Sequence, residues 1–235
     1  MPNKSRLESK RESYIPAFSN RLFTPFYDFI MKWAALEPIF KPRLVMQARL
    51  KRSYRILDVG CGTATLTILI KKTQPESEVV GLDGDLEILE IAKSKIAKAG
   101  FSIRLDYGMA FDLPYPRGSF DRVFSSMVLH HLTHENKLRS VEEMFRVLKP
   151  GGELHVADFG KPQNILMYLV SLVMRHLEQT SDLIQGSLPK LLSKAGFCRV
   201  EETAKFMTLF GTVVLHRAIK GEGVSSPATY LGSRL

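Results

Sequence analysis

The stretch from Arg55 to Asp83 constrains the fold more than any other part of this sequence. A short apolar strand runs into a glycine-rich turn, which is followed by a helical span and a second strand that ends on a carboxylate. A chain that passes from strand to helix within a few residues needs positive φ or close backbone approach, which Gly60 and Gly62 supply. This order of elements predicts the first unit of a nucleotide-binding α/β sheet.

Two carboxylates beside the turn indicate what kind of ligand it binds. Asp83 follows the turn by about twenty residues, a spacing at which a strand-end carboxylate accepts hydrogen bonds from the hydroxyls of a ribose. Asp58 precedes the first glycine, where its charge would repel the pyrophosphate of a dinucleotide and attract a cation. Asp58 therefore counts against a dinucleotide and favours a ligand with a positive charge, whereas Asp83 indicates a ribose.

The run Leu57-Asp58-Val59-Gly60-Cys61-Gly62 closely resembles the first motif of class I S-adenosylmethionine-dependent methyltransferases. The resemblance implies S-adenosyl-L-methionine as cofactor and S-adenosyl-L-homocysteine as product. It also implies that Asp58 and the turn Gly60-Cys61-Gly62 hold the cationic methionine end. Asp83 would hold the ribose, with Gly84 beside it in the cofactor site.

A later loop, residues 108–115, looks like the loop with which this family grips adenine. Met109 stands where many members have an acid, so we expect the backbone of Met109 and Ala110, or Asp112, to recognise the adenine edge. The thioether of Met109 would pack against the adenine face. Ala64 is a second departure, since the family often has a third glycine there.

Residues 118–126 resemble the family's fourth strand, and open parallel sheets bind ligands at the carboxyl ends of their strands. Ser125 is therefore predicted to contact the cofactor, and His130 and His131 to line the acceptor pocket as candidate catalytic residues. Histidine titrates near neutral pH and can take a proton from an acceptor. The alternative is structural: one histidine caps the next helix and the other is buried and hydrogen-bonded.

The predicted fold class is α/β, with a Rossmann-like, seven-stranded, mostly parallel sheet, helices on both faces and a C-terminal antiparallel strand. Beyond the first unit, the sequence pattern predicts helices at 85–100, 142–149 and 188–195 and strands at 101–107, 153–158, 198–205 and 210–220. The resemblance adds the fourth strand at 118–126.

Composition agrees with a single enzyme domain. A chain of 235 residues has room for one large α/β core. Cys61 and Cys198 form neither a disulfide framework nor a metal-ligand pattern, and we expect no metal. No segment approaches the roughly 20 apolar residues that span a bilayer, and residues 1–10 lack a signal-peptide core. We therefore expect a cytoplasmic protein.

The domain boundaries follow from these patterns. Residues 1–50 are predicted to form an N-terminal helical lid, in which Tyr27 would contact the cofactor, although most of its aromatic residues would pack on the sheet. The methyltransferase domain would span 51–220, with a helical insertion at about 160–187. Residues 221–235 would form a flexible tail.

The acceptor is predicted to be a small hydrophobic molecule that is quinone-, phenol-, isoprenoid- or lipid-like. Residues 165–174 are almost wholly apolar and would either cap the sheet edge or wall an apolar acceptor pocket. The resemblance is closest to the ubiquinone/menaquinone-biosynthesis C-methyltransferase-like (methyltransferase type 11) group. A nucleic-acid partner is not expected despite the net charge of +9. No Asn-Pro-Pro-Tyr-like tetrad follows the fourth strand, which argues against adenine-N6 methylation of nucleic acid.

Three alternatives stay open. The basic stretch at 41–55 could touch membrane phosphates or could be an ordinary solvated flank; its members are Lys41, Arg43, Arg49, Lys51, Arg52 and Arg55. The chain could be a methyltransferase-like binding protein that transfers nothing. A nicotinamide-dependent reductase shares the opening unit, but Asp58 counts against it. The sequence does not indicate an oligomeric state.

Overall fold

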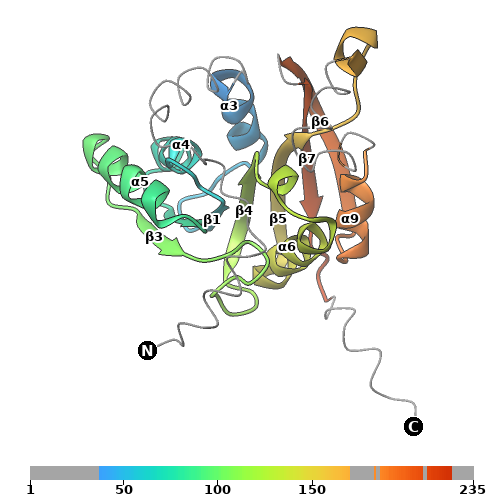
Figure 1. Ribbon diagram of the computed structural model, residues 1–235. Coiled ribbons are helices and arrows are strands. Elements are labelled where there is room, and N and C mark those ends of the chain that lie inside the picture. The colour runs from blue at the N-terminus through green and yellow to red at the C-terminus, as the bar shows by residue number, and fades with distance from the viewer. Residues whose placement is uncertain (1–36, 170–182, 184–185, 209–210, 224–235) are drawn as a thin grey trace, which may run out of the picture.

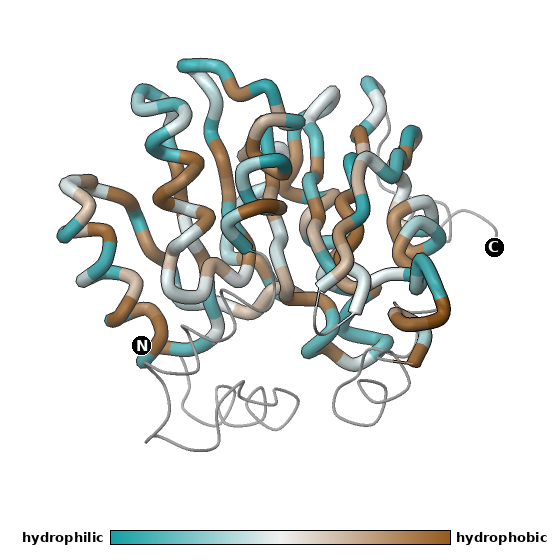
Figure 2. The backbone as a smooth tube through the Cα atoms, turned by 90° about the horizontal axis from the view of Figure 1, so that it is seen from above, coloured by the Kyte–Doolittle hydropathy of each residue, from teal (hydrophilic) through white to brown (hydrophobic). Residues whose placement is uncertain are grey.

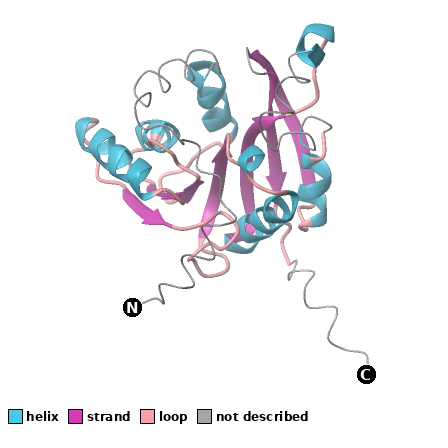
Figure 3. Cartoon of the chain, in the orientation of Figure 1, coloured by secondary structure: helices cyan, strands magenta, loops and turns pink. Residues whose placement is uncertain are grey.

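The computed structural model describes residues 37–169, 183, 186–208 and 211–223. In this part of the chain one central sheet is flanked by helices on both faces (Figures 1 and 3). The predicted lid contact Tyr27 and most of the predicted tail and helical insertion lie outside the described residues.

The sheet has seven strands, and all of them except one run in the same direction. β7 is antiparallel to both of its neighbours, β5 and β6. This arrangement confirms the predicted Rossmann-like, mostly parallel sheet with a C-terminal antiparallel strand. In spatial order the strands are β3 (Arg104–Tyr107), β2 (Glu78–Asp83), β1 (Arg55–Val59), β4 (Phe120–Ser126), β5 (Leu148–Phe159), β7 (Gly211–Ile219) and β6 (Arg199–Thr208).

Helices cover the two faces in separate groups (Figure 1). α3 and α4 share a buried apolar cluster on one face, and α5 packs against α4 there. α6 and α9 share the larger cluster on the opposite face, together with the apolar side chains of the loop after β3. The described helices are α3 (Glu37–Gln47), α4 (Thr65–Thr73), α5 (Leu86–Lys98), the 3-10 helix η1 (Leu129–His131), α6 (His134–Val147) and α9 (Leu188–Lys194).

The core follows the hydropathy of the chain. In Figure 2 hydrophobic and hydrophilic residues alternate along the flanking helices. Four consecutive residues of β1, from Ile56 to Val59, are buried, as expected for a parallel strand covered on both faces. Asp58 is the exception to the apolar character of this strand, and its burial marks the site described below.

The structure corrects three predicted boundaries. β5 begins at Leu148, five residues before the predicted start of the fifth strand. α6 begins at His134, well before the predicted start, because the Thr133 side chain accepts a hydrogen bond from the Asn136 N–H and caps the helix. The third strand is shorter than predicted and begins at Arg104. Within the predicted helical insertion, a helix begins at Ile165 and is described to residue 169. Among the helices in the described ranges, none has the length and apolar character needed to cross a bilayer.

Candidate active site

The strand order reverses between β1 and β4, since β2 lies on one side of β1 and β4 on the other. At such a switch point the loops that follow the strands diverge and leave a crevice outside their carboxyl ends. Asp58 and Asp83 lie at or near the ends of β1 and β2, and Ser125 pairs with Val59 near the end of β4. The structure therefore brings these three predicted residues to one edge of the sheet.

The glycine turn is fastened to β2 by its backbone. The N–H groups of Gly60 and Cys61 both donate to the Leu82 carbonyl, at 2.8 and 2.9 Å. The Gly62 N–H donates to Asp83 Oδ2 at 2.8 Å. The side chain of Cys61 is buried, so this residue can offer a ligand little besides its backbone.

The two glycines of the turn are needed for different reasons. Both have positive φ, +68° at Gly60 and +53° at Gly62. A Cβ at Gly60 would lie 2.4 Å from Val128 Cγ2, whereas a Cβ at Gly62 would have no atom of the described chain within 4 Å. Gly60 thus permits close packing within the protein, and Gly62 leaves open space where a ligand can approach the backbone.

Ala64 adopts the left-handed conformation that the family's third glycine would suit. Its φ is +60°, and it forms the N-cap of α4 without a side-chain hydrogen bond. A left-handed alanine costs roughly 1–2 kcal/mol relative to glycine. The chain therefore keeps the backbone shape of the motif and carries some local strain there.

Asp83 is positioned from two sides. Its Oδ2 accepts from the Gly62 N–H and its Oδ1 accepts from the Asp85 N–H at 3.0 Å. Burial raises the pKa of this carboxyl in spite of those hydrogen bonds. Each carboxylate oxygen has a second lone pair, so Asp83 can still accept from two ligand hydroxyls.

Asp58 lies beneath the turn rather than on its surface. It is 1% exposed and accepts a hydrogen bond from Thr67 Oγ1 of α4 at 2.7 Å. Burial raises its pKa to about 6, and the hydrogen bond from Thr67 opposes that rise. Near neutral pH the site therefore has a negative charge under the turn that is fixed by α4.

Met109 and Gly84 lie together beside Asp83. A Cβ on Gly84 would come within 2.9 Å of Met109 Sδ, so the missing side chain lets the thioether approach the end of β2. Met109 is buried, and its carbonyl accepts from the Asp112 N–H at 3.0 Å, which closes the loop. Ala110 is partly buried next to it. The loop thus brings the predicted adenine contacts next to the predicted ribose contact.

Two serine hydroxyls at the end of β4 are buried. Ser125 Oγ and Ser126 Oγ have no hydrogen-bond partner among the described residues. Such groups normally have one, and a polar ligand can provide it. The space at Gly62 is open, and the Asp83 carboxylate can accept further hydrogen bonds. Together with the two serine hydroxyls, these features fit a nucleoside with a charged tail.

The two histidines occupy different environments. His130 is buried, and its Nδ1 lies 2.9 Å from Asp158 Oδ1 at the end of β5. Asp158 also accepts from the N–H groups of Leu129 and Phe159, both at 2.8 Å. These contacts match the buried, hydrogen-bonded histidine of the structural alternative. The other part of that alternative is wrong, because Thr133, not a histidine, caps α6.

The His131 ring packs against the His130 ring, with centroids 3.9 Å apart and ring planes tilted by 43°. Burial, and next the neighbouring His130, lower the pKa of His131 to about 3. Its imidazole is therefore neutral near pH 7. In that form it can accept one hydrogen bond and donate another.

Sequence reasoning missed three residues of this edge. Asp158 orients His130, Thr67 holds Asp58, and Val128 packs on Gly60. Only Asp158 had a usable signal, since it ends a buried parallel strand just as Asp83 does. In the described part of the chain no group of three metal-ligating side chains could hold a metal ion.

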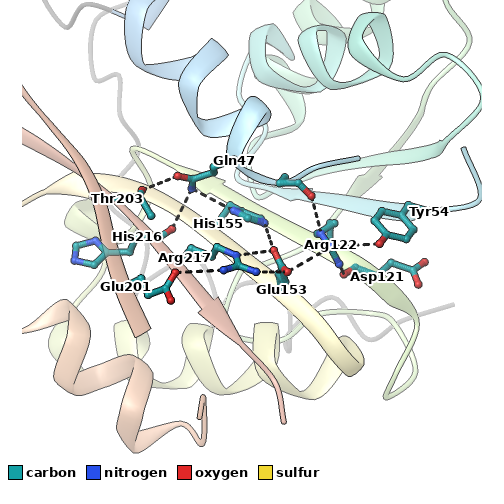
Figure 4. A network of polar contacts seen from close by, with 11 residues as sticks. Gln47, Tyr54, Asp121, Arg122, Glu153, His155, Glu201, Thr203, His216 and Arg217 are labelled. Atoms are coloured by element: carbon teal, nitrogen blue, oxygen red, sulfur yellow. Dashed lines mark hydrogen bonds and ion pairs between the residues drawn. The ribbon is translucent and has the colours of Figure 1, made fainter. Parts of the chain in front are cut away.

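A second polar network lies between the C-terminal end of α3 and strands β4, β5 and β7 (Figure 4). Glu153 accepts from Arg217 at 2.6 and 2.9 Å and lies 3.5 Å from Arg122. Gln47 at the end of α3 contacts His155 Nδ1 at 3.2 Å. We call this group the α3 anchor network. It ties α3 to β4, β5 and β7, away from the predicted site residues.

Comparison with known proteins gives a consistent result. Residues 56–152 match the family model described as a methyltransferase domain. A demethylmenaquinone methyltransferase of Deinococcus radiodurans is 33% identical over 173 residues, which cover 70% of each chain. An uncharacterized methyltransferase of Synechocystis is 33% identical over 151 residues, which cover 63% of this chain and 68% of that protein.

Solved structures share the fold. The S-adenosylmethionine-dependent methyltransferase SibL in its apo form aligns with a TM-score of 0.67 at 24% identity. The alignment covers 93% of this chain and 62% of that chain.

Proposed function

The chain belongs to the class I S-adenosylmethionine-dependent methyltransferases, and from that premise we propose that it methylates a small hydrophobic acceptor of the quinone or phenol type. When bound, S-adenosylmethionine supplies a methyl group on a positively charged sulfur that leaves as a neutral thioether. The remaining work of the protein is to align the acceptor and to exclude water.

An exposed apolar surface carries the proposal for the acceptor. After β5 the chain forms a helical turn, and Asn164 Nδ2 lies 3.2 Å from Met207 Sδ near the end of β6. Exposed apolar clusters on a soluble enzyme commonly mark binding surfaces. We call the exposed side chains here the apolar rim: Ile165, Leu166, Tyr168, Leu169 and Met207. The rim follows the same sheet edge as Asp158, and the name of the Deinococcus relative makes a demethylated quinone the first acceptor to test.

On the cofactor side, the proposal gives each predicted residue one role. Asp58 supplies the negative charge under the methionine end, and the Gly60-Cys61-Gly62 turn supplies the backbone on which that end lies. Asp83, with Gly84 beside it, accepts from the ribose hydroxyls. Met109 and Ala110 lie against the adenine, Ser125 contacts the methionine end from the β4 side of the turn, and Tyr27 closes over the site from the N-terminal lid.

On the acceptor side, the proposal assigns His130 and His131 to the pocket wall. Asp158 holds the His130 ring in one orientation through Nδ1. The neutral ring of His131 accepts a hydrogen bond from an acceptor hydroxyl and so orients it toward the methyl group. Because the low pKa makes His131 a weak base, its main contribution is alignment, and the proton that the acceptor loses on methylation passes to solvent.

The test is methyl transfer from radiolabelled S-adenosylmethionine to a panel of acceptors. The panel contains a demethylated prenyl naphthoquinol, the same quinol without its prenyl chain, a simple phenol and a mixture of transfer RNA and DNA. We expect label in the organic extract with the prenylated quinol, and less with the quinol that lacks the chain. The Gly62→Val variant, which places a branched side chain in the ligand space, serves as the inactive control.

Two outcomes would contradict the proposal. Label that appears only in nucleic acid would refute a hydrophobic acceptor. Tight binding of S-adenosylhomocysteine without transfer to any acceptor would instead favour the non-catalytic binding protein. A parallel calorimetric titration with NAD tests the reductase alternative, and we expect no binding heat.

A further inference from the structure

The N-terminal end of helix α3 lies nearer to the ligand-binding edge of the sheet than its C-terminal end does. At its other end, Gln47 contacts His155, and the neighbouring Ala48 carbonyl accepts from Arg122 Nε at 3.0 Å. Those contacts place the C-terminal end of α3 over the body of β4 and β5, as Figure 4 shows. The first turns of the helix must therefore lie further along the sheet.

Ring contacts show where these first turns of α3 lie along the strand direction of the sheet. The Phe40 ring lies 6.4 Å from the Phe206 ring. Phe206 pairs with Val213, and Val213 pairs with Phe159, the last residue of β5. Phe40 is thus level with the carboxyl end of the sheet, and Lys41 follows it directly.

Lys41 is a partly buried cation at this edge. Its Nζ lies 2.8 Å from Glu37 Oε2 one turn earlier, and the two side chains are only 12% and 20% exposed. Lys41 is also near enough to Asp58 for its charge to lower the pKa of that carboxyl. By contrast, Arg43 of the same helix is exposed. Lys41 therefore differs from a solvated surface charge in its position and its surroundings.

The methionine end of the cofactor contains a group that a lysine ammonium binds. This end carries an ammonium group and a carboxylate. Asp58 can balance the ammonium group, whereas the N–H groups of the glycine turn already donate to Leu82 and Asp83 and do not account for the carboxylate. A lysine ammonium is a common partner for a carboxylate, and partial burial strengthens such a bond. The Glu37 carboxylate can hold the ammonium of Lys41 in the absence of the cofactor.

We propose that Lys41 binds the carboxylate of the cofactor's methionine end, with Glu37 orienting its ammonium group. This inference rests on the proposed function, because it places that methionine end between Asp58 and α3. It also changes the meaning of the basic stretch at 41–55. The first residue of that stretch is part of the cofactor site rather than a contact to membrane phosphates.

The experiment pairs a change in the protein with the matching change in the ligand. Dissociation constants are measured by calorimetry for S-adenosylhomocysteine and for its decarboxylated analogue, 5′-deoxy-5′-(3-aminopropylthio)adenosine. Lys41→Met should weaken binding of S-adenosylhomocysteine about tenfold to hundredfold, the usual range for a lost charge-assisted hydrogen bond. It should change binding of the analogue by less than about threefold.

Two control variants separate this role from general effects of charge and folding. Arg43→Met removes the same charge from the exposed side of α3 and should change neither constant. Lys41→Arg keeps the charge and should retain most of the affinity for S-adenosylhomocysteine, even if Lys41→Met is too unstable to measure.

The outcomes are distinguishable. Equal loss for both ligands in Lys41→Met, or no loss for either, would overturn the role of Lys41. A large loss of S-adenosylhomocysteine affinity in Arg43→Met would also overturn it, because long-range charge would then explain the effect. Failure of the wild-type protein to bind either nucleoside would refute the proposed function itself, and this inference with it.

Discussion

At the scale of single residues, Asp58 is a buried acid whose ionisation opposes folding. Burial raises its pKa to about 6, above the value near 4 of an exposed aspartate. The folded state therefore holds this proton more tightly than the unfolded chain does. Stability from this group is lost as pH rises from about 4 to about 6, and the full penalty remains at higher pH.

Asp58→Asn should therefore stabilise the fold near neutral pH and weaken cofactor binding. The asparagine oxygen can still accept from Thr67 Oγ1, so the substitution removes the charge and keeps this hydrogen bond. We expect the free energy of unfolding to rise by about 1–3 kcal/mol at pH 7.5 and to change little below pH 4. Urea unfolding at the two pH values measures this difference.

Thr67→Val is the matched control for Asp58→Asn. It removes the hydrogen bond that stabilises the ionised carboxylate and should lower stability at pH 7.5. An Asp58→Asn variant that is equally destabilised at both pH values would contradict the account, because the lost interaction would then not depend on charge.

The two glycines of the turn should respond differently to the same substitution. Gly60→Ala places a Cβ 2.4 Å from Val128 Cγ2 at positive φ, so we expect a loss of more than about 2 kcal/mol in stability. Gly62→Ala adds only the left-handed strain of roughly 1–2 kcal/mol, but its methyl group enters the ligand space.

Thermal unfolding and calorimetric titration with S-adenosylhomocysteine measure the two effects of the glycine substitutions. Gly60→Ala should show the larger fall in stability, and Gly62→Ala should lose affinity although it remains folded. The reverse order of stabilities would mean that the turn is packed differently.

The sequence predicted those parts of the site that depend on local spacing. Gly60, Gly62 and Asp83 belong to one strand-turn-helix-strand unit, and their order implies their meeting at one edge. The pairing of His130 with Asp158 could not be predicted in the same way, because the two residues come from different strand ends. The distinct environments of His130 and His131 depend on that tertiary contact.

At the scale of elements, the α3 anchor network holds α3 against the sheet. Burial opposes ionisation of Glu153, but hydrogen bonds from His155 and Arg217 outweigh it and lower its pKa below the ordinary value. Its contribution to stability is therefore present above about pH 4.5 and is lost as pH falls through the lowered pKa.

Glu153→Gln should be strongly destabilising. It leaves Arg122 and Arg217 without their shared countercharge, for an expected loss of about 3–5 kcal/mol in the free energy of unfolding. Glu201→Gln is the control, because Glu201 pairs with Arg217 from an exposed position. This substitution should lower the free energy of unfolding by less than about 1 kcal/mol. Equal losses in urea unfolding of the two variants would show that burial of the network is unimportant.

The elements themselves were predictable where hydrophobic periodicity is strong. The predicted helices at 85–100 and 188–195 agree with α5 and α9 to within about two residues. The start of α6 was missed because its cap, Thr133, precedes a polar first turn with little apolar periodicity. Propensity and spacing describe the middle of an element better than its capped end.

At the scale of the whole molecule, charge and apolar surface are unevenly arranged. Several members of the basic stretch at 41–55 have acidic partners, for example Arg52 with Glu76 and Arg55 with Glu78. These pairs favour the ordinary solvated flank over a membrane contact for that stretch. The apolar rim at the carboxyl edge is the surface that the proposed function uses.

The most direct test of the central claim is hydrogen–deuterium exchange of the whole protein with and without S-adenosylhomocysteine. We expect slower exchange in peptides that cover 58–64, 82–86 and 108–112, and no change at 199–205 on the far edge of the sheet. Binding without protection of the glycine turn and the end of β2, or with protection confined to β6, would contradict a cofactor site at the β1/β4 switch point.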